Sequence, residues 1–188
     1  WRNYCISDTY EPGSVAKAMT IAAGLDSGKL TGNETYVCNG VLEVSGHPIK
    51  CHKHIGHGVV TVSQALEQSC NVALMHIGEQ MGKDLSGEAR TNTLVYNVDD
   101  MVASDLAIST FGQGYNVTMI QMATAFSSII NGGKYYQPHV VTEIKSADGT
   151  TVEKVEPRML KQVISSTTSD TMKTYLANVC SVGTGSAA

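Results

Sequence analysis

The sequence carries a serine and a lysine three positions apart near its beginning, in the tetrad Ser14-Val15-Ala16-Lys17. Residues at this spacing share one face of a helix, so the serine oxygen and the lysine amine can meet within hydrogen-bond reach. A serine hydroxyl is a weak nucleophile until a base takes its proton, and burial lowers the pKa of a lysine toward that of a usable base. The tetrad predicts acyl transfer through Ser14 with Lys17 as the base. The alternative is a solvated surface pair, because this spacing often arises by chance.

A second pair of polar side chains stands farther along the chain, in the triplet Ser69-Cys70-Asn71. It falls at a break between two expected helices, where side chains can point into a cleft. There Ser69 would relay a proton between the lysine and a leaving group, and Asn71 would bind a substrate amide. The alternative is a helix break with capping side chains. An S-x-x-K followed by an S-x-N is typical of penicillin-recognising serine enzymes, which also need a K-T-G.

Two cysteines and three histidines fall within one glycine-rich stretch of twenty residues. They are Cys38, Cys51, His52, His54 and His57. Thiolate and imidazole together suit Zn²⁺, which takes four such ligands tetrahedrally. A hairpin would bring Cys38 beside Cys51, and His54 follows Cys51 at a common ligand spacing. We expect a structural Zn²⁺ site with Cys38, Cys51, His54 and His57 as ligands.

Other interpretations of these cysteines stay open. Cys38 and Cys51 could form a disulfide outside the cytoplasm, or remain free buried thiols. Cys70 is expected to be a small buried apolar residue, since no partner that would activate it is evident. The chain has five cysteines, an odd number, so a fully paired disulfide framework is excluded.

Composition excludes several classes of protein. The chain has 188 residues, with 13 Lys and Arg against 17 Asp and Glu, for a formal net charge of −4. That balance argues against a nucleic-acid partner, which would require a basic face. A hydrophobic fraction of 42% is enough for a packed core. No stretch is long and apolar enough for a membrane helix.

The elements that must position these residues form a mixed α/β pattern in which helices supply most of the mass. Asp148-Gly149 between two extended runs is a strong hairpin signal, and the stretch 84–97 is polar and irregular. We expect helices at residues 14–25, 61–68, 72–81, 104–109, 118–130 and 169–180, and extended segments at 35–38, 41–44, 140–145 and 151–155.

Several blocks of the chain, in order, resemble class B penicillin-binding proteins. Residues 1–14 resemble the segment that leads into the nucleophile of that family, and residues 57–73 resemble the run into its second motif. Further similar blocks lie at 111–133, 138–141 and 179–188. The resemblance implies an α/β fold like that of penicillin-binding proteins and serine β-lactamases, with an antiparallel sheet, flanking helices and an all-helical subdomain.

The resemblance also implies a function, that of a monofunctional peptidoglycan D,D-transpeptidase of the division or sporulation type. Ser14 would attack stem peptides ending in D-Ala-D-Ala, Lys17 would be the base, and Ser69 and Asn71 would complete the cleft. β-Lactams would acylate Ser14, and catalysis would need no cofactor. The family implies the extracytoplasmic face of the bacterial membrane and a division or sporulation glycosyltransferase as partner. Some class B enzymes of anaerobic bacteria are similar to this chain in carrying a thiol-containing zinc motif.

The chain departs from the family pattern in one respect that bears on activity. It has no K-T-G: Val182 stands where a lysine would precede Gly183-Thr184, and residues 1–188 are expected to be a partial transpeptidase domain. The K-T-G strand, the first strands, the non-catalytic domain and the membrane anchor would lie outside it. We expect this stretch alone to turn over little substrate, since losing an oxyanion donor costs about 100- to 1000-fold in rate.

Three other functions remain as alternatives: a serine β-lactamase, a β-lactam sensor domain, or a catalytically inactive scaffold of a division or sporulation complex. A β-lactamase would need a deacylating glutamate, and Glu67, although close to Ser69, is interpreted as helix surface.

Overall fold

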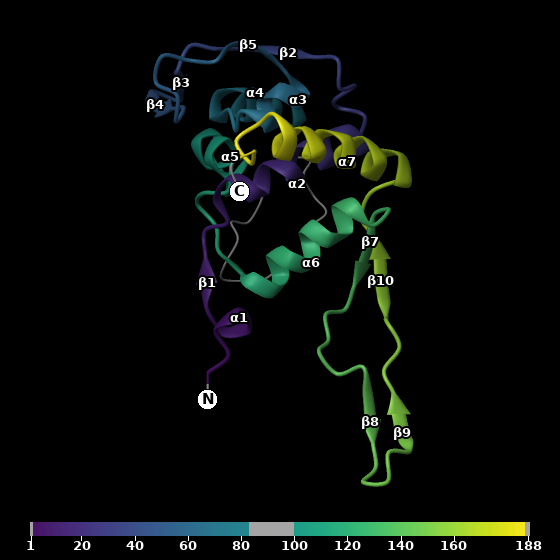
Figure 1. Ribbon diagram of the computed structural model, residues 1–188. Coiled ribbons are helices and arrows are strands. Elements are labelled where there is room, and N and C mark those ends of the chain that lie inside the picture. The colour runs from purple at the N-terminus through teal and green to yellow at the C-terminus, as the bar shows by residue number, and fades with distance from the viewer. Residues whose placement is uncertain (1, 83–99, 187–188) are drawn as a thin grey trace.

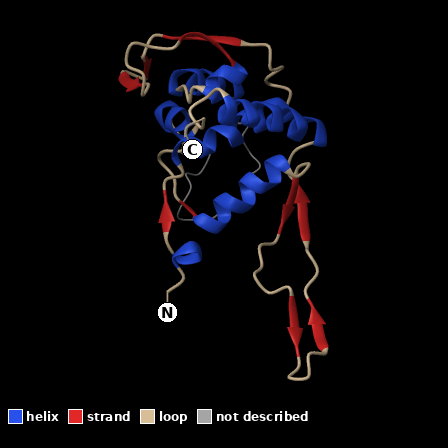
Figure 2. Ribbon diagram, in the orientation of Figure 1, coloured by secondary structure: helices blue, strands red, loops and turns tan. Residues whose placement is uncertain are grey.

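The computed structural model describes residues 2–82 and 100–186, and the segment 84–97 expected to be irregular lies outside them. Helices form the body of the molecule, as the sequence predicts (Figure 2). They are α1 (Tyr4–Ser7), α2 (Ala16–Asp26), α3 (Val62–Glu67), α4 (Asn71–Met81), α5 (Ala103–Ser109), α6 (Met119–Ile130) and α7 (Ser166–Ser181), with a 3-10 turn, η1 (Gly13–Val15), leading into α2.

The strands among the described residues are arranged as two-stranded antiparallel ribbons. The expected segments 35–38 and 41–44 are strands, but they pair with later segments and not with each other. The pairs are β1 (Thr9–Tyr10) with β6 (Val117–Thr118), β2 (Thr35–Cys38) with β5 (Gly58–Thr61), β3 (Val41–Val44) with β4 (His47–Lys50), β7 (Lys134–Tyr136) with β10 (Met159–Gln162), and β8 (Glu143–Lys145) with β9 (Thr151–Lys154).

Local sequence explains where the main helices begin. Thr61 precedes α3 and Gln64 lies three residues later, so the two side chains satisfy each other's backbone N–H groups, at 3.2 and 3.0 Å. Thr118 and Gln121 form the same capping box before α6. Ser165 caps α7 by accepting from the N–H of Thr168.

Helix α2 is the centre of the packing. It contacts α3, α4, α6 and α7, and Figure 1 shows it crossing the middle of the helical body. Its small residues allow this close approach on several sides, and its buried positions include Ala18, Ile21 and Ala22. Its partners supply larger apolar side chains, among them Leu74, Ile77 and Met172, none of which is measurably exposed. The apolar sequence of α2 is therefore explained by burial on nearly all sides.

A carboxylate ties the end of α2 to the beginning of α7. Asp26 Oδ1 accepts from the N–H of Ser165 at 2.7 Å and from Thr168 Oγ1 at 2.9 Å. Partial burial raises the pKa of Asp26, but these hydrogen bonds outweigh it and hold the pKa below its ordinary value. This anchor lies at the N-terminal end of α7, away from the residues expected to do chemistry.

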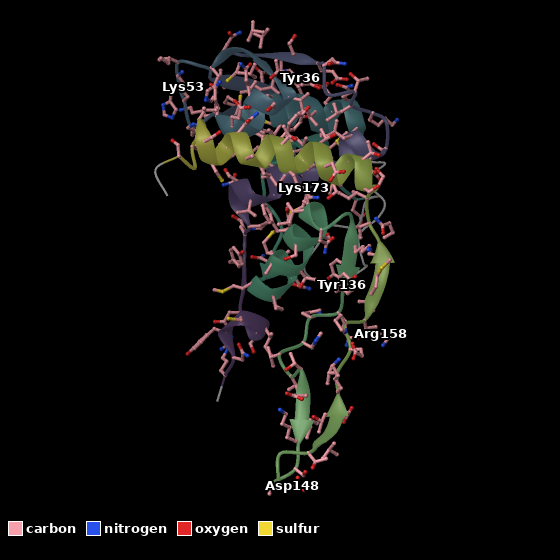
Figure 3. All side chains as sticks on the ribbon, turned by 45° about the vertical axis from the view of Figure 1, so that its right-hand side comes forward. Tyr36, Lys53, Tyr136, Asp148, Arg158 and Lys173 are labelled. Atoms are coloured by element: carbon pink, nitrogen blue, oxygen red, sulfur yellow. The ribbon has the colours of Figure 1, made fainter. Side chains whose placement is uncertain are left out.

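The ribbons β7–β10 and β8–β9 form an arm that extends away from the helices (Figure 1). The predicted turn Asp148-Gly149 stands at its tip, where Figure 3 labels Asp148. The side chains of β8, β9 and β10 are exposed. No helix within residues 2–82 and 100–186 has the length and apolar composition needed to cross a membrane.

Candidate active site

Ser14 stands at the entrance to the central helix. Pro12 and Gly13 turn the chain, with Gly13 in the left-handed region at φ +59°, and Ser14 lies in η1 just before α2 begins at Ala16. The Ser14 side chain is exposed, as a nucleophile must be. It also lies at the N-terminal end of a helix, where the dipole favours developing negative charge.

Lys17, three residues later, is buried and only 1% exposed. Its Nζ donates to Ser69 O, Ser69 Oγ and Asn71 Oδ1, each at 2.7 Å. An ammonium group has three protons, so these contacts satisfy all of them. The structure thus brings together the lysine of the first motif and both polar residues of the second.

Ser69 stands between Lys17 and Ser14. Its Oγ is 3.0 Å from Ser14 Oγ as well as 2.7 Å from Lys17 Nζ. The sequence predicts a direct meeting of Ser14 and Lys17, whereas the hydrogen bonds described for Lys17 reach Ser14 through Ser69. Burial directs the lysine inward, because Lys17 belongs to the packed face of α2 while Ser14 lies one turn earlier at the surface.

The corner that carries Ser69 has an unfavourable backbone conformation. Ser69 lies between α3 and α4 at φ +51°, in the left-handed region that non-glycine residues seldom occupy. The last turn of α3 holds it there, through Ser69 N–H to Leu66 O at 3.0 Å and Cys70 N–H to Ala65 O at 2.8 Å.

Asn71, the first residue of α4, uses both ends of its amide. Its Oδ1 accepts from Lys17, and its Nδ2 donates to the carbonyl oxygen of Lys50 at 3.3 Å. The amide expected to bind substrate is thus engaged with the protein in this structure. Through Lys50 it also joins the site to Cys51, the next residue.

The electrostatics of Lys17 fit the role of a base. Burial lowers the pKa of Lys17 from 10.5 to about 8, although the thiols of Cys51 and Cys70 act in the opposite direction. More of the amine is then neutral near physiological pH than in an exposed lysine, and the lone pair of the neutral form can accept the proton of Ser69 Oγ while that oxygen accepts from Ser14.

A cluster of sulfur and imidazole ligands lies directly behind this corner. The ligand atoms of Cys38, Cys51, His57 and Cys70 all lie within 4.8 Å of one another, and the three cysteines are buried. His57 Nδ1 is 3.5 Å from Cys38 Sγ and 3.6 Å from Cys51 Sγ. The three thiols are free. We call these four residues the thiol cluster.

The membership of the thiol cluster differs from the sequence expectation in one position. His54 is exposed and lies outside it, and Cys70 takes the fourth place. Cys70 follows the left-handed Ser69 and caps α4, with its Sγ accepting from the N–H of Ala73 at 3.4 Å. The spacing of Cys70 from the other cysteines in the sequence does not indicate that it joins them. Only the fold brings the α3–α4 corner beside the β2–β5 and β3–β4 ribbons.

Protonation in the thiol cluster differs from residue to residue. Burial raises the pKa of Cys70 to about 12. Burial also acts to raise the pKa of Cys51, but backbone N–H groups, those of Lys53 and Asn71 among them, outweigh it and lower that pKa. Burial lowers the pKa of His57, and the nearby His52 and Lys53 add to the effect, which favours the neutral imidazole that a metal ligand requires.

A third segment, residues 111–114, fixes the loop before Ser14, and the sequence by itself predicts no such role for it. Gly13 N–H donates to Gly112 O at 2.9 Å, and Gly114 N–H donates to Glu11 Oε1 at 2.9 Å. Gly112 is at φ +84°, and a Cβ there would overlap the backbone carbonyl of Gly13 and lie 2.6 Å from its nitrogen. The block 111–114 therefore packs backbone against backbone beside Ser14.

Two shallow recesses lie on the described surface. One, of about 260 Å³, adjoins the α3–α4 corner and is lined by His52, Lys53, His57, Glu67, Gln68, Val182, Gly183 and Thr184. The other, of about 500 Å³, lies between β2 and α4 and contains none of the four residues expected to be catalytic; it is lined by Thr35, Tyr36, Val37, His76, Glu79 and Gln80. Figure 3 labels Lys53 and Tyr36, which belong to the smaller and the larger recess respectively.

Comparison with known families places the chain. The profile described as "Penicillin binding protein transpeptidase domain" matches residues 1–188. "Stage V sporulation protein D" of Bacillus subtilis (strain 168) is 34% identical over 204 residues, covering 98% of this chain and 31% of that protein. "Penicillin-binding protein PbpB" of Mycolicibacterium smegmatis is 26% identical over 195 residues, covering 94% and 30%. The chain belongs to the penicillin-binding protein transpeptidase family, and it spans about a third of the length of these relatives.

Solved structures agree on the fold. The "D,D-Transpeptidase Domain of Peptidoglycan Glycosyltransferase from Eggerthella lenta" matches with a TM-score of 0.89 at 24% identity, covering 99% of this chain and 52% of that one. The "TP domain from Burkholderia pseudomallei penicillin-binding protein 3" matches with a TM-score of 0.76 at 26% identity, covering 97% and 57%. The α/β fold expected from the resemblance, with helices and antiparallel sheets, is confirmed.

We predict that Gly112→Ala lowers the rate at which a penicillin labels the protein by about 100-fold, because the added Cβ displaces Gly13 and the adjoining Ser14. Stopped-flow labelling with a fluorescent penicillin measures this. Gly149→Ala is the matched control: Gly149 has almost the same φ, +87°, but open space around it. Equal rates for the Gly112 variant and the unsubstituted protein would contradict the prediction.

Proposed function

We propose that this protein is a serine D,D-transpeptidase that cross-links peptidoglycan stem peptides ending in D-Ala-D-Ala. One observation carries the proposal: Lys17 Nζ lies 2.7 Å from Ser69 Oγ, which lies 3.0 Å from the exposed Ser14 Oγ. Such a chain from a buried amine to a surface hydroxyl is what a base needs to activate a nucleophile. Family membership supports the same chemistry.

The first half-reaction follows from this geometry. Ser14 Oγ bonds to the carbonyl carbon of the penultimate D-Ala, while its proton passes to Ser69 Oγ and the proton of Ser69 passes to the neutral amine of Lys17. The peptide C–N bond then breaks. The departing amine of the terminal D-Ala takes a proton back along the same path, leaving an ester on Ser14.

The second half-reaction uses an amine of a neighbouring stem peptide. It attacks the ester carbonyl and gives up one proton, which passes through Ser69 to the neutral amine of Lys17. The new amide bond forms as the ester C–O bond breaks, and that proton returns through Ser69 to the Ser14 oxygen. A β-lactam would enter the first half-reaction as a substrate mimic, with its ring amide in place of the peptide bond. The same three residues, Ser14, Lys17 and Ser69, would serve both half-reactions, and no cofactor takes part.

The setting of this reaction is part of the proposal. Peptidoglycan lies outside the cytoplasm, so the domain would act at the extracytoplasmic face of the membrane, held there by an anchor. A division or sporulation glycosyltransferase would supply the glycan strands. The 34% sequence identity to a protein named for stage V sporulation supports a role in division or sporulation.

Labelling tests the assignment of the nucleophile. A fluorescent penicillin should label the full-length protein covalently, and Ser14→Ala should abolish the label, because Ser14 supplies the exposed hydroxyl at the end of the Lys17–Ser69 hydrogen-bond chain. Ser127→Ala, which removes an exposed hydroxyl on α6, should label normally. Labelling of the Ser14 variant would contradict the proposal. Rapid loss of label would indicate a β-lactamase, and no label on the folded unsubstituted protein would indicate an inactive scaffold.

The rate of acylation should depend on pH through Lys17. Only the neutral amine accepts a proton, and its pKa is about 8, so the rate should rise about tenfold per pH unit below 8 and level off above it. A plateau reached only above pH 10 would contradict this role, since that is the behaviour of an exposed lysine. Lys17→Arg keeps a cation without a usable base and should be unreactive across the range.

We further propose that the thiol cluster holds a structural Zn²⁺ through Cys38, Cys51, His57 and Cys70. Three thiolates and one imidazole are a common zinc donor set, and their ligand atoms lie within 4.8 Å of one another. The ion would cross-link the β2–β5 and β3–β4 ribbons to the α3–α4 corner, and so stabilise the corner that carries Ser69 and Asn71.

Metal analysis tests this set of ligands. Protein purified without chelator should contain a single zinc ion per chain, and removing it should lower the melting temperature. His57→Ala and Cys51→Ser should lose the metal. His54→Ala is the matched control and should keep it, because His54 is exposed and lies outside the thiol cluster. Protein without zinc and with a Cys38–Cys51 disulfide by mass spectrometry would contradict the proposal.

A further inference from the structure

Glu67, the last residue of α3, is a bridge between helices and not the surface residue that its sequence context suggests. It is half-buried. Its Oε1 accepts from Ser63 Oγ at 2.6 Å, one turn earlier in α3, and from Asn178 Nδ2 at 3.2 Å, in α7. A carboxylate that accepts two hydrogen bonds is held in one orientation, so α3 is fixed against the C-terminal half of α7.

The backbone of Glu67 makes a second link to the same region. Its carbonyl oxygen accepts from the N–H of Thr184 at 2.8 Å, in the loop that follows α7. The neighbouring Gly183 fits so closely that a Cβ there would lie 2.5 Å from Glu67 O. The end of α3 is therefore joined to α7 by a side chain and to the following loop by a carbonyl.

This junction stands two residues before the left-handed Ser69. The strained backbone of Ser69 is held by hydrogen bonds to Leu66 O and, through Cys70, to Ala65 O, which are carbonyls of the last turn of α3. Conformations of this kind persist only where the surroundings determine them strongly. Any added backbone motion in the last turn of α3 therefore also moves Ser69.

We infer that Glu67 is a positioning residue, which holds Ser69 Oγ between Lys17 and Ser14 by locking α3 to α7 and to Gly183-Thr184. This deepens the proposed function and rests on it. Glu67 does not touch the nucleophile itself: the described contacts of its carboxylate are with Ser63 and Asn178. It therefore acts through the backbone of the corner and not as a proton acceptor for water, the role that a β-lactamase would require.

Acylation kinetics of the full-length protein test this inference. Glu67→Ala should lower the first-order acylation constant for a fluorescent penicillin by about tenfold and change its dissociation constant less than about twofold, because geometry and not binding is disturbed. Glu67→Gln keeps an oxygen that can accept from Ser63 and Asn178, so it should restore most of the rate. Asn178→Ala should show part of the loss, and adding it to Glu67→Ala should cost nothing more.

Asp26→Ala is the matched control. It removes a carboxylate that anchors the other end of α7, at Ser165 and Thr168, and so lowers stability without touching the corner. Its acylation constant should equal that of the unsubstituted protein. If the Glu67→Ala and Asp26→Ala proteins both lose acylation rate in proportion to their loss of stability, Glu67 has only a structural role and the inference is overturned.

Hydrogen exchange gives a readout that does not depend on labelling. Amides of residues 66–70 should exchange faster in the Glu67→Ala protein, and their exchange rates should be unchanged in the Asp26→Ala protein. Unchanged exchange at 66–70 in both would overturn the inference even if the unsubstituted protein were never labelled. A lack of labelling in the unsubstituted protein, with exchange altered as expected, would count against the proposed function alone.

Discussion

The buried amine of Lys17 is the constraint on which the rest of the site depends. A buried ammonium group is costly unless every proton has an acceptor, and here Ser69 supplies two acceptors and Asn71 the third. Helix α2 can bury Lys17 only where it packs against the α3–α4 corner. The contact that offsets the cost of burying Lys17 is thus the one that would lower the barrier to acyl transfer. The desolvation that costs stability would also provide a usable base.

The corner itself directs two of its side chains to Lys17 and the one between them away from it. Ser69 reaches Lys17 and Ser14, Cys70 points into the thiol cluster, and Asn71 joins Lys17 to the backbone of Lys50. A left-handed residue between two helices makes this arrangement possible, since it ends α3 and lets α4 begin two residues later. The strain is borne by the last turn of α3, which the Glu67 side chain links to α7.

Close backbone contacts complete the positioning. Gly112 meets Gly13 beside Ser14, and Gly183 meets Glu67 two residues before Ser69. At both places the absence of a side chain lets two segments distant in sequence hydrogen-bond through their backbones. Such contacts are stiffer than side-chain contacts, because they have no rotamers to change. One holds the segment that carries Ser14, and the other holds the segment that leads to Ser69.

Much of this protein could be predicted from its sequence, for reasons that are local. Capping residues at Thr61 and Thr118, the apolar run after Ser14 and the turn at Asp148-Gly149 determine helices and a hairpin through nearest-neighbour physics. The motifs determined which residue types could carry acyl transfer. Tertiary structure alone decided that Ser69 stands between Ser14 and Lys17, that Cys70 replaces His54 in the thiol cluster, and that Glu67 is a bridge. These three facts depend on which segments pack together, and burial and backbone direction at a contact between distant segments leave no trace in local spacing.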